Sequence, residues 1–198
     1  MHSLSSLHRS VSKQRLAQWH SHVGAVQADP VMQDWLTNRD SLTARLVARS
    51  QQFRVQRMKQ GRAVCLRDEF AALALPRVLQ VTEREVLLRC DERAVVYAHT
   101  VMPLNATASH WPLFASLGNR SLGTTLFSDP LVERGQLQYA RLGRRHPLMQ
   151  RIEKVHGLAD SIQFLWARRS VFRRKGSPLL VTEVFLPEIF SLAECANL

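Results

Sequence analysis

Apolar and polar residues alternate with a helical period near the start of the chain and with a strand period through most of the rest. Asp29-Pro30 is typical of a helix start, because Asp accepts hydrogen bonds from free N–H groups and Pro suits the first helical turn. Asp40-Ser41 predicts a second helix start. We expect residues 1–28 to form a flexible N-terminal extension and residues 29–198 to form a single domain.

Alternation with a period of two predicts strands from residue 53 onward. The residues on either side of Gln60-Gly61 predict a hairpin at that dipeptide. Further strands are predicted over residues 84–90, 94–102, 136–142, 162–172 and 179–186, short helices over 111–117 and 147–156, and a loop over 118–129. Short turns between strands favour antiparallel pairing, and helices that do not alternate with strands favour an α+β fold.

Two charged residues fall on apolar faces of these strands. Glu183 shares its face with Leu179, Val181 and Phe185, and Arg84 shares its face with Val86, Leu88 and Cys90. A buried charge needs a partner, so one interpretation is a structural ion pair or exposure at a strand end. The other is a small-molecule pocket in which the arginine binds a ligand carboxylate and the glutamate handles a hydroxyl group or a proton. The pattern alone leaves both open.

The composition changes this picture mainly through charge. The chain has 198 residues, 45% of them hydrophobic, which suffices for one core. It carries 27 basic against 16 acidic residues, and only four of the basic residues are lysine. Because the arginines are spread along the whole length, we expect a basic surface or an anionic ligand rather than a nucleic-acid partner. No apolar run is long enough to span a membrane, so no integral membrane association is expected.

The remaining motifs exclude several classes of site. The chain has no GxGxxG, GxxxxGK[ST], HExxH or GxSxG motif, so dinucleotide, nucleoside triphosphate, zinc-protease and serine-hydrolase chemistry have no support. The three cysteines, Cys65, Cys90 and Cys195, are too scattered to predict a disulfide framework or a metal site. We therefore expect a cytoplasmic protein without a metal.

Six short segments occur in a specific order. They are DSLT at 40–43, REVLL at 84–88, TVMP at 100–103, LG followed by LF at 122–127, LWARRS at 165–170 and LVTEVFLP at 180–187. Their order and spacing resemble the chorismate pyruvate-lyase family over residues 30–187, and the last two segments are the most specific. This family forms 4-hydroxybenzoate and pyruvate from chorismate at the start of bacterial ubiquinone synthesis.

The resemblance implies a six-stranded antiparallel sheet flanked by helices, an internal and largely apolar ligand cavity, and no cofactor. Matching by position, it implies that Arg84 binds the ring carboxylate of the substrate and that Glu183 faces the hydroxyl end of the ring. It further implies that Leu122 contacts the ligand through its backbone and that Leu42 lines the cavity. The expected small molecules are chorismate as substrate and 4-hydroxybenzoate as product, and the expected state is a monomer.

Several positions depart from the family pattern or stay open. Leu42 replaces a methionine, a volume-conserving change. His99 stands where the pattern leads us to expect arginine, so it is either a weaker, pH-dependent anion contact or a peripheral residue. The stretch between residues 142 and 165 is longer than expected and would form a surface helix or a lid. Arg168 or Arg169 either contacts the enolpyruvyl carboxylate or lies behind the site.

An alternative function is a non-catalytic module that binds a small carboxylate, because the sensor domains of GntR-type transcription regulators share this fold. Those domains normally follow an N-terminal winged-helix DNA-binding domain. The 28 residues before Asp29 are too few for one, so we expect an enzyme.

Overall fold

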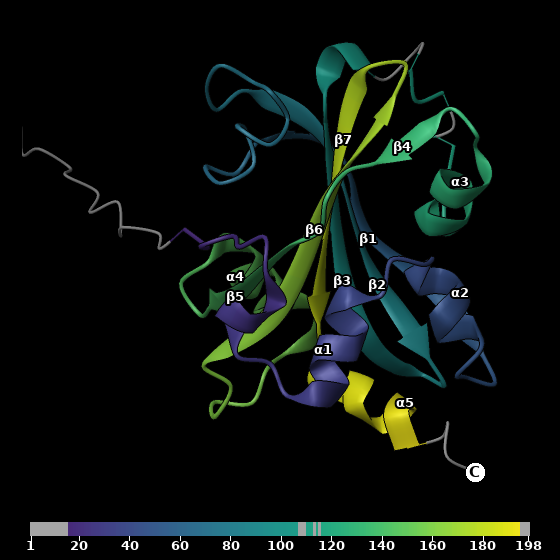
Figure 1. Ribbon diagram of the computed structural model, residues 1–198, viewed down its shortest axis with the longest axis vertical. Coiled ribbons are helices and arrows are strands. Elements are labelled where there is room, and N and C mark those ends of the chain that lie inside the picture. Colours follow the sequence, from purple (N-terminus) through teal and green to yellow (C-terminus); the bar gives the residue numbers. More distant parts are fainter. Residues whose placement is uncertain (1–15, 107–109, 113, 115, 195–198) are drawn as a thin grey trace, which may run out of the picture.

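The computed structural model describes residues 16–106, 110–112, 114 and 116–194, and its centre is a seven-stranded antiparallel sheet (Figure 1). The strands are β1 (Phe53–Val64), β2 (Gln80–Cys90), β3 (Arg93–Pro103), β4 (Val132–Arg134), β5 (Gln138–Gly143), β6 (Phe164–Arg174) and β7 (Ser177–Phe185). They run in the order β1-β2-β3-β7-β6-β4, and β5 also pairs with β6. The predicted α+β fold with an antiparallel sheet is confirmed.

The resemblance implied six strands, and the sheet has seven because its outermost position is divided. Both β4 and β5 pair with the same edge of β6, where Val132 lies opposite Arg174 and Gln138 opposite Arg169. Between them the Gly135 N–H donates to the carbonyl oxygen of Val171 at 2.8 Å. A Cβ atom at Gly135 would lie 2.9 Å from that oxygen, so the close approach at the break requires glycine.

The predicted helix starts are confirmed, and each is capped by a side chain. The carboxylate of Asp29 accepts a hydrogen bond from the Met32 N–H at the start of α1 (Pro30–Thr37). The hydroxyl of Ser41 accepts from the Ala44 N–H at the start of α2 (Leu42–Val47). Helix α4 (Pro147–His156) has the predicted bounds. The other helical elements are the 3₁₀ turns η1 (Val23–Val26), η2 (Leu104–Ala106) and η3 (Pro187–Phe190) and the helices α3 (Leu122–Ser128) and α5 (Ser191–Glu194).

The expected N-terminal extension, 1–28, falls into two parts. Residues 1–15 lie outside the described residues. The rest lies against the sheet: His20 forms an isolated β-bridge with Tyr139, and Val26 is buried in η1. The Trp19 indole N–H also donates to the Asp68 carboxylate at 3.0 Å. Contact with the folded body therefore begins before the expected boundary at residue 29.

Three local predictions were wrong. The hairpin expected at Gln60-Gly61 is absent, because β1 continues through it and pairs with β2 along its whole length. A register shift between Arg57 and Lys59 changes the face that each later side chain of β1 occupies. The alternation of apolar and polar residues is therefore interrupted within β1, and the sequence resembles two separate strands. The second error is the loop expected over 118–129, where α3 forms and buries the side chain of its own Leu126. The helix expected over 111–117 is not formed by the described residues there, which lie in turns and loops.

Different helices cover the two faces of the sheet. On the face that carries Val86 and Phe185, α1, α2 and α5 pack over one apolar cluster, while Leu126 of α3 packs over a second cluster with Phe172. On the opposite face, α4 packs over Tyr97. In Figure 1, α2 and α3 lie to the right of the sheet and α4 to the left. The longer stretch between residues 142 and 165 thus covers the face opposite Arg84 and is no lid over it.

None of the described helices is long and apolar enough to cross a membrane.

Candidate active site

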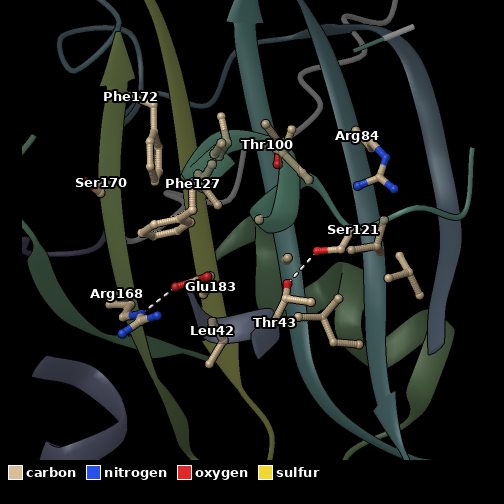
Figure 2. A pocket seen from close by; sticks show the side chains of 18 of the residues that line it. Leu42, Thr43, Arg84, Thr100, Ser121, Phe127, Arg168, Ser170, Phe172 and Glu183 are labelled. Atoms are coloured by element: carbon tan, nitrogen blue, oxygen red, sulfur yellow. Dashed lines mark hydrogen bonds and ion pairs between the residues drawn. The ribbon is translucent and has the colours of Figure 1, made fainter. Parts of the chain in front are cut away.

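A cavity lies between the sheet and the two helices α2 and α3 (Figure 2). It contains about 610 Å³ of space free of atoms, a volume that includes open solvent at its mouth. All four residues named from the sequence line it: Arg84 from β2, Glu183 from β7, Leu42 from α2 and Leu122 from α3. The structure therefore brings together residues that lie up to 141 positions apart in the chain.

The strand register sets the spacing between the two charged residues. Arg84 pairs with Thr100 on β3, and Ala98, two positions earlier on β3, pairs with Glu183. Strands lie about 4.8 Å apart, so the backbones of β2 and β7 are about 10 Å apart with β3 between them. Thr100 and Ala98 also line the cavity and form its floor. Arg84 and Glu183 thus stand on the same face of the sheet and reach into the cavity from two different strands, as Figure 2 shows.

Arg84 is a buried cation without an acidic partner among the described residues. Its Nη2 donates to the carbonyl oxygens of Gly118 at 3.1 Å and Arg120 at 2.9 Å, while its Nε is buried with no hydrogen-bond partner. Burial, together with the nearby charge of Arg57, lowers the pKa of Arg84 to about 10. A guanidinium in this state favours an incoming carboxylate, which would supply both the missing acceptor and the missing negative charge.

Glu183 is held by Arg168, its cross-strand neighbour on β6. Arg168 Nε donates to Glu183 Oε2 at 2.5 Å. The same guanidinium uses Nη1 to reach the carbonyl oxygens of Trp35 at 2.9 Å and Asn38 at 2.7 Å, at the end of α1. Figure 2 shows the Glu183 carboxylate between Arg168 and the body of the cavity. Arg168 therefore fixes the direction of the carboxylate, and its own charge is already balanced there.

A third arginine in the cavity, Arg134 of β4, was missed by the sequence reasoning. Its guanidinium carbon lies 5.4 Å from the ring centroids of both Phe127 and Phe172, and its Nη1 donates to the Arg39 carbonyl oxygen at 2.5 Å. Its Nε is buried without a hydrogen-bond partner. Burial and, to a smaller extent, the charge of Arg168 outweigh the opposing charge of Glu183 and lower the pKa of Arg134 to about 10. A strand of three residues is too short to show alternation, so no pattern in the sequence marks this residue.

The charges in the cavity do not balance. Its lining contains three arginines and one glutamate, and Arg168 already pairs with that glutamate. Two positive charges remain, one at Arg84 and one at Arg134. A cavity of this kind suits a ligand that carries two negative charges.

The wall formed by the two helices is closed by a short polar contact. The hydroxyl groups of Thr43 on α2 and Ser121 at the start of α3 lie 2.5 Å apart (Figure 2). Gly123 packs directly against them, since a Cβ there would lie 2.7 Å from Thr43 Oγ1. Leu42 directly precedes Thr43 in the chain, and Leu122 directly follows Ser121. Both line the cavity with apolar surface.

Two residues whose roles the sequence left undecided lie on the face of the sheet opposite the cavity. His99 is buried there, with Nε2 3.0 Å from Glu69 Oε1 and Nδ1 3.6 Å from Glu85 Oε1, so its peripheral interpretation is the right one for this cavity. Arg169 also points to that side, where its Nη1 donates to the Asp68 carbonyl oxygen at 2.7 Å. Of the pair Arg168 and Arg169, only Arg168 lines the cavity.

The same opposite face holds three potential metal ligands close together, Glu83, Glu85 and His99. Their carboxylates already have cationic partners. Lys59 Nζ lies 2.5 Å from Glu83, and Arg151 pairs with both Glu83 and Glu85. These side chains form a buried charge network, and the cavity with Arg84 remains the candidate active site.

Solved structures share this fold at low sequence identity. A GntR-family transcriptional regulator from Bacillus cereus aligns with a TM-score of 0.52 and 13% identity, over 69% of this chain and 92% of that chain. The effector domain of PhnF from Mycobacterium smegmatis aligns with a TM-score of 0.51 and 14% identity, over 76% and 91% of the two chains. These similarities show a common fold.

Sequence comparisons are more specific. A protein of Cupriavidus metallidurans named "Probable chorismate pyruvate-lyase" is 46% identical over 91% of this chain and 85% of its own length. A protein of Ralstonia nicotianae with the same name is 50% identical over 78% and 80% of the two chains. The family pattern described as "Chorismate lyase" matches residues 14–195. With nearly the whole chain matched, this protein belongs to the chorismate lyase family.

Proposed function

We propose that this protein converts chorismate into 4-hydroxybenzoate and pyruvate. The observation that carries the proposal is that Arg84, buried and without an acidic partner among the described residues, and Glu183, paired with Arg168, line one cavity. Membership of the chorismate lyase family supports it, as do the names of the similar proteins. The two unbalanced positive charges of the cavity match a substrate that carries two carboxylates.

Arg84 binds the ring carboxylate of chorismate through paired N–H groups, in the manner of arginine–carboxylate pairs. The ring lies over Ala98 and Thr100, with Leu42 and Leu122 above it. This wall is mostly apolar and excludes water, which strengthens each polar contact inside. The substrate is thereby held with its reacting end toward Glu183.

Glu183 then accepts the proton from C4 of the ring as the bond between C3 and the ether oxygen breaks. The ring becomes aromatic and keeps its hydroxyl group at C4. The departing enolpyruvyl group takes up a proton at its methylene carbon and becomes pyruvate. Atoms and electrons balance without an oxidant or a co-reactant. Arg168 holds the carboxylate in position for this transfer.

The test is to incubate the purified protein with chorismate and to measure 4-hydroxybenzoate by its absorbance and pyruvate separately. We expect the two products in equal amounts. Replacing Glu183 with Gln should lower kcat by about 10²- to 10⁴-fold, the usual range for a general base. Arg84→Gln should lower kcat/KM about 10- to 100-fold, because a charge-assisted contact is lost. Arg62→Gln, at an exposed position of β1, serves as the control.

Two outcomes would redirect the proposal. Tight binding of 4-hydroxybenzoate without turnover of chorismate would favour the alternative, a non-catalytic module for small carboxylates. Turnover to another substituted benzoate would indicate a related lyase. We further propose that the protein acts as a monomer in the cytoplasm and that its product enters ubiquinone synthesis.

A further inference from the structure

We infer that Arg134 binds the second carboxylate of the substrate, the one on the enolpyruvyl group, and so makes the site selective for dicarboxylates. This inference rests on the proposed function, since it assigns the second charged group of that substrate. It adds to the site a residue of β4 that none of the sequence motifs contains.

The position of Arg134 fits the far end of the ligand. Across the sheet, Arg84 is on β2, Glu183 on β7 and Arg134 on β4. Four strand spacings, about 19 Å at the backbone, separate the two arginines. Both side chains nevertheless line the same cavity, so they reach into it from opposite sides. A molecule whose first carboxylate lies at Arg84 and whose reacting carbons lie at Glu183 extends next toward Arg134.

Arg134 is also prepared to accept a carboxylate. Its guanidinium lies over two aromatic rings, those of Phe127 and Phe172, and is anchored by one donated bond to the Arg39 carbonyl oxygen. These contacts restrict the long side chain, so little freedom is lost when an anion binds. Its buried Nε has no acceptor. Stacking on rings leaves the edge of the guanidinium, which carries the N–H donors, available for a carboxylate.

The other candidate, Arg168, is already committed. Its Nε binds Glu183 and its Nη1 binds carbonyl oxygens at the end of α1, and its side chain is only 1% exposed. Moving it to the substrate would release Glu183 from its position. Once Arg84 has bound the ring carboxylate, Arg134 is the remaining cation of the described cavity lining without an anionic partner.

The inference predicts a difference between ligands with one and two carboxylates. 4-Hydroxybenzoate has only the ring carboxylate and should not use Arg134. Chorismate has both, and so does the unreactive compound 3-(carboxymethoxy)benzoate, which carries a second carboxylate on an ether at the corresponding ring position. A residue that merely supports the cavity would affect all three ligands alike.

The experiment measures kcat/KM for chorismate and dissociation constants for the other two ligands by calorimetry. In Arg134→Gln, we expect chorismate kcat/KM and the affinity for 3-(carboxymethoxy)benzoate to fall about 10- to 100-fold, as for the loss of a charge-assisted contact. The affinity for 4-hydroxybenzoate should change by less than about threefold, the effect of a distant screened charge. Arg173→Gln is the matched control, because it removes a positive charge at an exposed position of the neighbouring strand β6.

An equal loss for both benzoates, or no loss for either, would overturn the inference. Within each variant, the dissociation constant for 4-hydroxybenzoate is divided by that for 3-(carboxymethoxy)benzoate. A general loosening of the cavity weakens both ligands alike and leaves this ratio unchanged. If Arg134→Gln does not fold, Arg134→Lys keeps the charge but loses the planar fork. The dissociation constant for 4-hydroxybenzoate divided by that for 3-(carboxymethoxy)benzoate should then fall severalfold. An unchanged ratio in that variant would also overturn it. A wild-type protein that does not turn over chorismate would end the proposed function, while the two binding constants would still test Arg134.

Discussion

Arg168 and Glu183, paired side by side on β6 and β7, join the active-site carboxylate to the end of α1. One nitrogen of the guanidinium holds the carboxylate at 2.5 Å, and another holds the carbonyl oxygens of Trp35 and Asn38. The position of a reacting group thus depends on a helix whose own start is fixed by the Asp29 cap. Arg168 is a positioning residue in this arrangement.

Replacing Arg168 with Gln should affect both stability and catalysis. Removing one partner of a buried ion pair costs about 3–5 kcal/mol, because the other charge is left uncompensated. We expect the free energy of unfolding in urea to fall by that amount. In the folded fraction kcat should fall, while 4-hydroxybenzoate should still bind through Arg84. If the double variant Arg168→Gln/Glu183→Gln is no more stable than Arg168→Gln alone, the stability loss does not come from the unpaired carboxylate.

The contact between α2 and α3 leads to a second prediction. In Gly123→Ala the new Cβ would meet Thr43 Oγ1 at 2.7 Å, which is too close, so the Thr43 side chain or α3 must shift and the contact between the two helices is disturbed. Overpacking of this kind costs about 1–3 kcal/mol. We expect the dissociation rate of 4-hydroxybenzoate to rise severalfold, measured by stopped-flow fluorescence, because the wall of the cavity is loosened.

Two variants test this explanation. Gly61→Ala is the control, because no atom lies within 4 Å of a Cβ at that position. Thr43→Ala removes the hydroxyl that causes the clash, so Gly123→Ala/Thr43→Ala should release the product at the rate of Thr43→Ala alone. A further rise in the double variant would show that the effect arises elsewhere.

The buried charge network behind the sheet predicts how stability depends on pH. Burial opposes the charge on His99, yet Glu69 and Glu85 outweigh it and raise the pKa of His99 to about 9. Because the pKa in the folded state exceeds the unfolded value of about 6.5, this stabilisation is complete below about pH 6.5. It decreases as the pH rises and is lost once the pH passes about 9.

The measurement is urea unfolding between pH 6 and pH 10, with His99→Gln as the comparison. The difference in the free energy of unfolding between wild type and variant should shrink as the pH rises through that range. A difference that stays constant, or grows, would show that His99 is not charged in the folded protein.

At low pH, the effect of burial on Glu85 is outweighed by His99 and Arg151, which hold the pKa of Glu85 at about 2. The Glu85 contribution should therefore be complete above about pH 4.5 and decline as the pH falls toward 2.

Alternation placed Arg84 and Glu183 correctly because both lie in long, regular strands of the sheet interior, where successive side chains occupy opposite faces. Alternation within each strand cannot show that Arg84 and Glu183 lie on the same face of the sheet. That follows from the order β2-β3-β7, which depends on pairing between distant parts of the chain. The family resemblance supplied this relation, and the structure gives its geometry.

The failures of the sequence reasoning have local causes. Gly61 was interpreted as a turn residue, but in β1 it is simply extended opposite Glu83. Arg134 lies in a strand of three residues, so no pattern marks the face it occupies. His99 was considered as an anion contact from its neighbours in sequence, although it points to the opposite face from Thr100. Side-chain direction in short or irregular segments depends on tertiary pairing, which one sequence does not reveal.

The central claim is that a benzoate-sized ring lies between Arg84 and Glu183. A crystal structure of the protein with 4-hydroxybenzoate tests it most directly. We predict the carboxylate within hydrogen-bond distance of the Arg84 guanidinium and the hydroxyl group at the Glu183 carboxylate, with Arg134 making no contact with the ligand. A ligand bound in the reverse direction, with its carboxylate at Arg134, or bound outside this cavity, would contradict the account.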